Sequence, residues 1–169
     1  GGISSQMLKD LSTGHVLIGH SEQRQYSNED NDSLKSKITD VLTKDISPIF
    51  CIGEPQEIKA ENRTKDYLCR QLEILESFDS NLITIAYEPI WAIGSGENAD
   101  NSYIEEVHRH IKEFCCQELN FKEKVSVVYG GSVKLENCEE ILSSSEVDGL
   151  LIGGASLDPD TFSKIYNLS

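Results

Sequence analysis

The sequence predicts an α/β fold with a parallel sheet, on three observations. Short apolar segments alternate with helical patterns from one end of the chain to the other. These segments are apolar almost throughout, as strands covered on both faces are. Each segment is followed by polar or glycine residues that are poor strand formers but useful in catalysis or binding. Such alternation implies parallel strands joined by right-handed crossovers.

Five strands are expected along the chain. They lie at His15–Gly19, Ile49–Ile52, Leu82–Tyr87, Val125–Tyr129 and Gly149–Ile152. Five strands are too few to close an eight-stranded barrel. They could form an open doubly wound sheet or one part of a barrel, and the alternation alone does not decide between the two.

Apolar residues at helical spacing predict amphipathic helices between these strands. Three sets stand out: Leu34, Ile38, Val41 and Leu42; Leu68, Leu72 and Leu75; Ile104, Val107, Ile111, Phe114 and Cys115. Weaker patterns cover Ser5–Leu11, Glu136–Leu142 and Pro159–Leu168. No linker or low-complexity stretch interrupts the pattern, so residues 1–169 are expected to form a single domain.

Charge and cysteine content narrow the class of protein. The net charge of −14 argues against nucleic acid or anionic membrane as a partner. No long apolar run is present, so no membrane span is expected. The five cysteines have irregular spacing and form no Cys-x-x-Cys pair, which argues against a disulfide framework or a structural zinc site. Free thiols predict a reducing compartment, most simply the cytoplasm.

Glu88 is the first candidate functional residue. It ends an apolar strand and is followed by Pro89 and a mostly apolar segment that finishes at Gly94 and Gly96. One interpretation is a carboxylate paired with a basic residue or capping a loop. The other is a general base for moving a carbon-bound proton, in a site that the loop closes.

His20 also follows a strand, and the residues after it favour the start of a helix. A helix N-terminus disfavours the imidazolium form. A neutral imidazole there could donate a hydrogen bond to a substrate oxygen and stabilise an enolate-like state. The alternative is a core histidine bonded to a carbonyl. No catalytic role and no bound metal is expected for the other histidines, His15, His108 and His110.

Two glycine pairs favour a phosphate site. Gly130-Gly131-Ser132 and Gly153-Gly154 each follow an apolar strand and precede an expected helix. Backbone amides at such turns bind phosphate, and glycine permits the positive φ and close approach that this requires. A tight strand–helix turn explains one pair equally well. Two pairs after the last two strands match the phosphate site typical of barrel enzymes.

Four more residues near strand ends have less specific interpretations. Cys51 is expected to be a packed thiol rather than a nucleophile. Glu54 is expected to form a structural ion pair with a basic residue. Glu22 and Arg24 are either supports for the site or the charged first turn of a helix.

Taken in order, these motifs resemble the triosephosphate isomerase family. The matching segments are Gly19-His20-Ser21-Glu22, Cys51-Ile52-Gly53-Glu54, Ala86-Tyr87-Glu88-Pro89-Ile90-Trp91-Ala92-Ile93-Gly94, Tyr129-Gly130-Gly131-Ser132 and Gly153-Gly154-Ala155-Ser156. The resemblance covers essentially the whole chain. It implies a (β/α)8 TIM barrel of which this chain supplies about the last five strands and their helices.

The resemblance also implies a reaction, the interconversion of dihydroxyacetone phosphate and D-glyceraldehyde 3-phosphate without metal or organic cofactor. Glu88 would be the base and His20 the neutral electrophile, with Pro89 to Glu97 as the lid. Glu22 and Cys51 would support these residues. The phosphate would be held by the backbone amides of Gly94, Ser132, Gly153 and Gly154.

Some features depart from the family pattern. The family has three earlier strands that this sequence lacks, and the first of them ends in an Asn-x-Lys pair that binds substrate. The chain is therefore expected to start in the loop after the third strand. The 169 residues alone are expected to be inactive, and the full-length protein to be a homodimer. Gln23 and Glu97 replace residues that are usual in the family. The alternatives are an inactive phosphate-binding or scaffold remnant of the same fold, and another phosphate-binding barrel enzyme.

Overall fold

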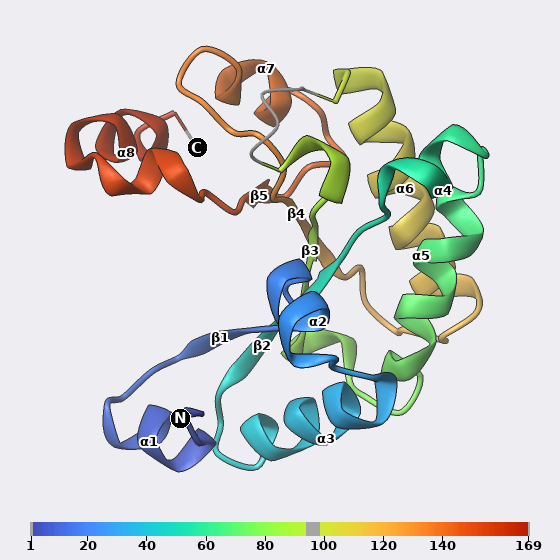
Figure 1. Ribbon diagram of the computed structural model, residues 1–169, viewed down its shortest axis with the longest axis vertical. Coiled ribbons are helices and arrows are strands. Elements are labelled where there is room, and N and C mark those ends of the chain that lie inside the picture. The colour runs from blue at the N-terminus through green and yellow to red at the C-terminus, as the bar shows by residue number, and fades with distance from the viewer. Residues whose placement is uncertain (1, 94–98, 169) are drawn as a thin grey trace.

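The chain folds around one five-stranded parallel sheet. A computed structural model describes residues 2–93 and 99–168. The strands are β1 (His15–Ile18), β2 (Ser47–Ile52), β3 (Thr84–Tyr87), β4 (Ser126–Tyr129) and β5 (Gly149–Leu150). All five pair in parallel in the order β1-β2-β3-β4-β5 (Figure 1). The five predicted strands are therefore confirmed.

Each strand differs from its predicted bounds at one end, by one or two residues. Leu82 was expected to open the third strand, and this is wrong. It closes a 3-10 turn, Ser80–Leu82, whose first turn is capped by Asp79 Oδ1 accepting the amide of Asn81 at 3.1 Å. The last strand ends at Leu150 rather than Ile152, although Leu151 N still donates to Tyr129 O at 2.8 Å.

The strand order separates the two architectures that the alternation left open. A doubly wound sheet reverses its strand order at a switch point. In the described residues each strand pairs with its neighbours in sequence and no reversal occurs. This order is that of consecutive strands in a β/α barrel.

Parallel pairing brings the carboxyl ends of the strands to one edge. Ile52 aligns with Tyr87, and Tyr87 aligns with Tyr129. The ladder continues past the strands, because Glu88 N donates to Ile52 O at 2.7 Å and Gly130 N donates to Tyr87 O at 2.8 Å. The residues that follow each strand are thus held side by side.

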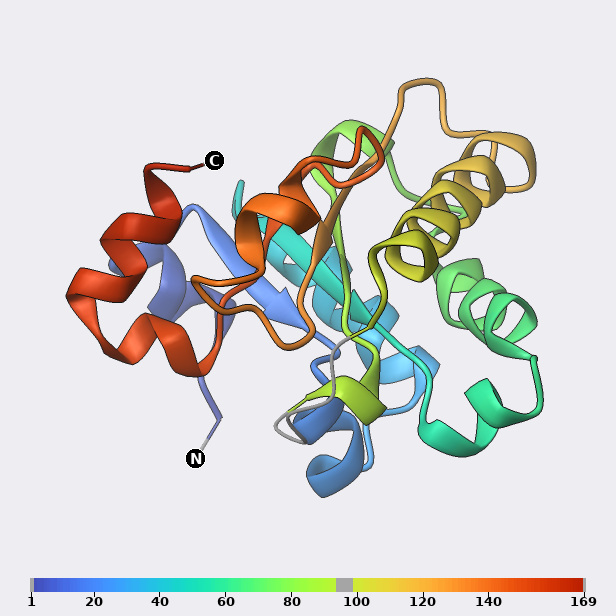
Figure 2. The ribbon, with the colours of Figure 1, turned by 90° about the horizontal axis from the view of Figure 1, so that it is seen from above.

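The helices follow the apolar patterns. They are α1 (Ser5–Asp10), α2 (Ser21–Ser27), α3 (Asn31–Leu42), α4 (Gln56–Ala60), α5 (Thr64–Leu72), α6 (Asn101–Gln117), α7 (Cys138–Leu142) and α8 (Pro159–Tyr166). Side chains of Ser4, Asp30 and Asp158 cap the first turns of α1, α3 and α8. Figures 1 and 2 show α5 and α6 together on one side of the sheet.

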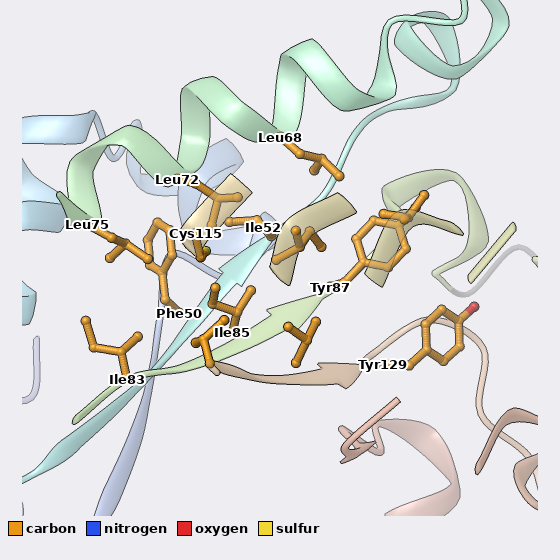
Figure 3. Close-up of a cluster of buried hydrophobic side chains, with 14 of the residues drawn as sticks. Phe50, Ile52, Leu68, Leu72, Leu75, Ile83, Ile85, Tyr87, Cys115 and Tyr129 are labelled. Atoms are coloured by element: carbon orange, nitrogen blue, oxygen red, sulfur yellow. The ribbon is translucent and has the colours of Figure 1, made fainter. Parts of the chain in front are cut away.

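The core lies between the sheet and these helices. Leu68, Leu72 and Leu75 are fully buried and face strand residues such as Phe50 and Ile85 (Figure 3). Burial of this apolar surface is the main favourable contribution to folding. It holds β2 and β3 rigidly, and so positions the residues that follow them.

The opposite face of the sheet is less covered. Leu17 of β1 points to that face, away from Ile18, and it is 44% exposed.

No helix in the described residues is long and apolar enough to cross a membrane.

Candidate active site

Residues that follow β1, β3, β4 and β5 line one cavity of about 510 Å³. Of the residues singled out by sequence, the cavity brings together His20, Glu88, Ser132, Gly153 and Gly154. The last four residues of the predicted lid, 94–97, which include Gly94 and Glu97, lie outside the described residues. The cavity therefore combines a carboxylate, an imidazole and two glycine turns at the carboxyl edge of the sheet.

Glu88 is buried at the end of β3, with 4% of its surface exposed. Its Oε1 lies 3.3 Å from His20 Nε2, and its Oε2 has no hydrogen-bond partner among the described residues. Burial raises the pKa of Glu88, and this effect outweighs the opposing influence of His20. A partly unsatisfied carboxylate of raised pKa suits proton transfer better than it suits a structural ion pair.

His20 is the N-cap of α2, and its ring is oriented by that helix. The backbone N–H of Glu22 donates to His20 Nδ1 at 3.4 Å. A ring nitrogen that accepts a hydrogen bond carries no proton, so the proton of a neutral imidazole is assigned to Nε2. That nitrogen faces Glu88 and the cavity. The geometry fits a neutral hydrogen-bond donor.

Glycines pack directly against the backbone and side chain of Glu88. A Cβ at Gly53 would lie 1.8 Å from the carbonyl oxygen of Glu88. A Cβ at Gly130 would lie 2.8 Å from Glu88 Cγ. Both distances are shorter than any van der Waals contact, so these two positions need glycine for the carboxylate to lie where it does.

The second glycine pair is different. A Cβ at Gly153 or at Gly154 would meet no atom of the described residues within 4 Å. Neither residue has a positive φ; among the described glycines only Gly19 does, at 76°. The expectation that these pairs use positive φ is therefore wrong. Their backbone instead borders open space in the cavity, where a ligand atom could approach closely.

The first glycine pair precedes a helix, α7, as expected, but an irregular turn separates the two. Asn137 Nδ2 donates to the carbonyl of Ser132 at 2.9 Å, and Asn137 Oδ1 accepts from the amide of Lys134 at 2.7 Å. This pair of bonds stabilises an irregular turn, and α7 begins only at Cys138.

Comparison with known proteins agrees with this geometry. The family model for triosephosphate isomerase matches residues 1–169. The triosephosphate isomerase of Dictyoglomus turgidum is 42% identical over 168 residues, covering 96% of this chain and 68% of that protein. That of Mesomycoplasma hyopneumoniae strain 7448 is 43% identical, covering 98% and 66%. That of Gloeobacter violaceus is 39% identical, covering 99% and 68%.

The chain belongs to the triosephosphate isomerase family. It spans about two thirds of the length of these relatives. Family membership confirms the barrel fold that the sequence predicted, and the five-stranded sheet is an arc of that barrel.

In this member of the triosephosphate isomerase family, Arg24 braces two strand ends. Its Nε donates to Gly19 O at 2.7 Å and its Nη2 to Cys51 O at 2.8 Å. The guanidinium is partly buried, which lowers its pKa, and it also lies over the ring of Phe50. Two interpretations of Arg24 were open, and the structure agrees with the one in which Arg24 supports the site.

Cys51 and Glu22, the two other predicted supports of the triosephosphate isomerase site, both act on the charge of Glu88 or respond to it. Cys51 is buried beside Glu88, and burial together with the charge of Glu88 raises the pKa of the thiol. The thiol is therefore protonated, as expected of a packed cysteine. Glu22 is exposed in the first turn of α2, and its charge contributes to raising the pKa of Glu88.

The prediction for Glu54 is wrong. It was expected to pair with a basic residue, but no ion pair reaches it among the described residues. Its carboxylate is fully buried, and its Oε1 accepts hydrogen bonds from Trp91 Nε1 at 2.8 Å, Tyr103 Oη at 2.9 Å and Tyr87 Oη at 3.1 Å. It anchors the segment that follows the family's Glu-Pro motif.

Sequence reasoning missed several residues of this triosephosphate isomerase site. Gln71 of α5 accepts the amide of Gly53 at 2.9 Å and so fixes the end of β2. Lys134 lines the cavity beside Ser132. Its place two residues after the Gly-Gly-Ser motif was the available signal.

His108 packs against two tyrosines at the ends of the central strands. It is fully buried, its ring centroid lies 5.8 Å from that of Tyr87 and 6.3 Å from that of Tyr129, and its Nδ1 lies 3.2 Å from Glu146 O. Burial lowers the pKa of His108 to about 4. Among the described residues, no group of three or more His, Cys, Asp or Glu side chains is placed to hold a metal ion.

Proposed function

We propose that this protein interconverts dihydroxyacetone phosphate and D-glyceraldehyde 3-phosphate. The observation that carries the proposal is the buried carboxylate of Glu88, whose Oε1 lies 3.3 Å from His20 Nε2, in a cavity also lined by glycines. This arrangement supplies a base, a hydrogen-bond donor for oxygen and an anion site. The names of the relatives agree with it.

The reaction moves one proton between adjacent carbons. Glu88 takes a proton from carbon 1 of dihydroxyacetone phosphate, and the electron pair moves to the carbonyl oxygen on carbon 2. His20 Nε2–H donates to that oxygen and stabilises the enediolate. The carboxyl proton of Glu88 is then delivered to carbon 2, and carbon 1 becomes the aldehyde as its hydroxyl proton passes to the oxygen on carbon 2. Glu88 supplies the base and His20 the hydrogen-bond donor for the oxyanion, so we propose that the reaction needs no metal or organic cofactor.

The phosphate of the substrate is assigned to the amides of Ser132, Gly153 and Gly154, together with Gly94. The support is the open space beside Gly153 and Gly154, where backbone N–H groups can meet an anion closely. Lys134 adds a positive charge at the edge of the cavity, in a chain whose net charge of −14 would otherwise repel a phosphate.

Supporting roles follow for Glu22 and Cys51. Cys51 fills the space beside the carboxylate of Glu88 and keeps water away from it, while Glu22 raises its basicity through charge. Both act on Glu88 without touching substrate.

The cellular setting is proposed on the same basis. We place the reaction in glycolysis and gluconeogenesis, in the cytoplasm, with residues 1–169 as part of one barrel domain of a homodimer. The five free cysteines support a reducing compartment. The acidic charge supports the absence of nucleic acid or membrane as partner.

The full-length protein tests the proposal. It should interconvert the two triose phosphates, and Glu88→Asp should lower kcat by about 100-fold, because the carboxylate is withdrawn by one methylene from the reacting carbon. KM should change little. A full-length protein that folds but turns over neither triose phosphate would favour the inactive remnant instead, and unchanged turnover in Glu88→Asp would exclude Glu88 as the base.

A further inference from the structure

The turn that follows Glu88 is held by side chains outside the substrate cavity. It forms a 3-10 turn over Ile90–Ala92, and Ile90 N donates to Glu54 O at 3.0 Å. The indole of Trp91 in this turn is 8% exposed and donates through Nε1 to Glu54 Oε1 at 2.8 Å. The turn is therefore tied to the end of β2 by its backbone and by its side chain.

A lysine from α4 contacts the same indole from a different direction. Lys59 Nζ lies 3.0 Å from the centroid of the Trp91 ring and 5.4 Å from that of Tyr103. A cation over the face of tryptophan is attracted by the electron density of the ring, and tryptophan is the best of the aromatic side chains for this contact. Among the described residues, Lys59 forms no ion pair with a carboxylate, so its ammonium is directed at the rings.

The contacts of Trp91 with Glu54 and with Lys59 are complementary. The hydrogen bond to Glu54 lies along the edge of the indole and fixes where the ring points, whereas the ammonium of Lys59 lies over its face and fixes the tilt. Tyr103 completes the set, because its hydroxyl donates to the same Glu54 oxygen and its ring packs edge-on against Trp91 at 6.0 Å. We call Glu54, Lys59, Trp91 and Tyr103 the hinge cluster.

The hinge cluster is close to the base along the chain. Trp91 follows Glu88 by three residues, and Pro89 between them restricts the backbone. A change in the tilt of Trp91 is therefore transmitted to the peptide that carries Glu88. A displacement of about 1 Å in a reacting group lowers the rate by about 100-fold.

We propose that Lys59 is a positioning residue for the isomerisation, holding Trp91 by its ammonium so that Glu88 is correctly placed. The proposal rests on the proposed function, because it assigns the effect to kcat of that reaction. It assigns no contact between Lys59 and substrate.

The test compares Lys59→Met with Lys59→Arg in the full-length protein. Methionine keeps an unbranched apolar chain and removes the charge, whereas arginine keeps the charge. We expect Lys59→Met to lower kcat about tenfold with KM changed less than about twofold, and Lys59→Arg to restore kcat to within about twofold. Lys35→Met, at an exposed position on α3, is the matched control and should behave as wild type.

Fluorescence gives a readout that does not depend on turnover. Trp91 is the single tryptophan of this chain, and the emission lost in Trp91→Phe identifies its signal in the full-length protein. Lys59→Met should shift that emission and increase its quenching by acrylamide, and Lys59→Arg should reverse both changes. If Lys59→Met fails to fold, Lys59→Gln takes its place in both measurements.

The outcomes separate this inference from the proposed function. A wild-type protein without isomerase activity overturns the proposed function, and with it the assignment to kcat, while an altered emission would still show that Lys59 orients Trp91. An active wild type with kcat and emission unchanged in Lys59→Met overturns the inference alone. Equal losses in Lys59→Met and Lys59→Arg would also overturn it, because they would reveal packing rather than charge.

Discussion

At the scale of single residues, the most consequential feature is the buried carboxylate of Glu88. It has one oxygen without a partner among the described residues, and burial raises its pKa. A buried ionised group that lacks hydrogen bonds destabilises the fold. The burial that makes Glu88 a good base therefore also lowers the stability of the folded protein at neutral pH.

This trade-off predicts how stability changes with pH. The pKa of Glu88 is higher in the folded state than in the unfolded state, so the folded protein binds this proton more tightly. The Glu88 carboxyl stabilises the folded protein below about pH 4.3, its pKa in the unfolded state. This contribution to stability is lost as the pH rises through its pKa in the folded state. Glu88→Gln should then be more stable than wild type at pH 7, by about 1 kcal/mol.

Urea unfolding at several pH values measures this effect. The advantage of Glu88→Gln should shrink as the pH is lowered toward 4, while exposed Glu123→Gln should show no such trend. A Glu88→Gln protein less stable than wild type at pH 7 would show that the carboxylate does not destabilise the folded state.

At the scale of elements, the end of β2 sets the position of the segment after β3. Gly53→Ala would place a methyl group 1.8 Å from the carbonyl oxygen of Glu88. The peptide between Glu88 and Pro89 would have to move, and kcat should fall by about 100-fold or more. Steady-state kinetics of the full-length variant measure this. Gly14→Ala, where a Cβ would meet nothing within 4 Å, is the control, and similar kinetics for the two variants would contradict the account.

The turn after β5 gives the opposite prediction. A Cβ at Gly153 would touch no atom of the described residues within 4 Å, so Gly153→Ala should leave the free energy of unfolding within about 0.5 kcal/mol of wild type. It should nevertheless weaken competitive inhibition by inorganic phosphate about tenfold, since the methyl group would occupy ligand space. Lower stability with unchanged phosphate affinity would instead favour the tight-turn interpretation.

The sequence predicted those parts of the site whose signal is local. A strand followed by Glu88, His20 or a glycine pair can be read from a few consecutive residues. The partners of Glu54 could not be predicted, because Tyr87, Trp91 and Tyr103 come from three different elements and meet only in the folded protein. Leu82 was misassigned because its apolar character continues the strand pattern, whereas capping by Asp79 decides its conformation.

At the scale of the whole molecule, the sheet has two open edges. Within the described part of the chain, β1 pairs only with β2, and β5 pairs only with β4. Leu17 is 44% exposed on the face opposite α5, in a family whose fold is a closed barrel. An unpaired strand edge and exposed apolar surface favour association with other chains.

These open edges predict the behaviour of the 169 residues on their own. Purified alone, they should show no measurable isomerase turnover and should aggregate. Co-expression with a chain that supplies three further β/α units of the same family should give a soluble complex with restored turnover, measured by size-exclusion chromatography and a coupled assay. The matched control is the same pair carrying Glu88→Gln, which should assemble without activity. Robust turnover by the 169 residues alone would contradict this account.

The central claim is that Glu88 moves a proton between carbons, and deuterium exchange tests it most directly. The full-length protein is incubated with dihydroxyacetone phosphate in D₂O, and the label at carbon 1 is followed by proton NMR. We expect stereospecific uptake of one deuterium at carbon 1, together with deuterium at carbon 2 of the glyceraldehyde 3-phosphate formed. Glu88→Gln should abolish both, because the amide cannot accept the proton. Exchange at the wild-type rate in Glu88→Gln would contradict the claim.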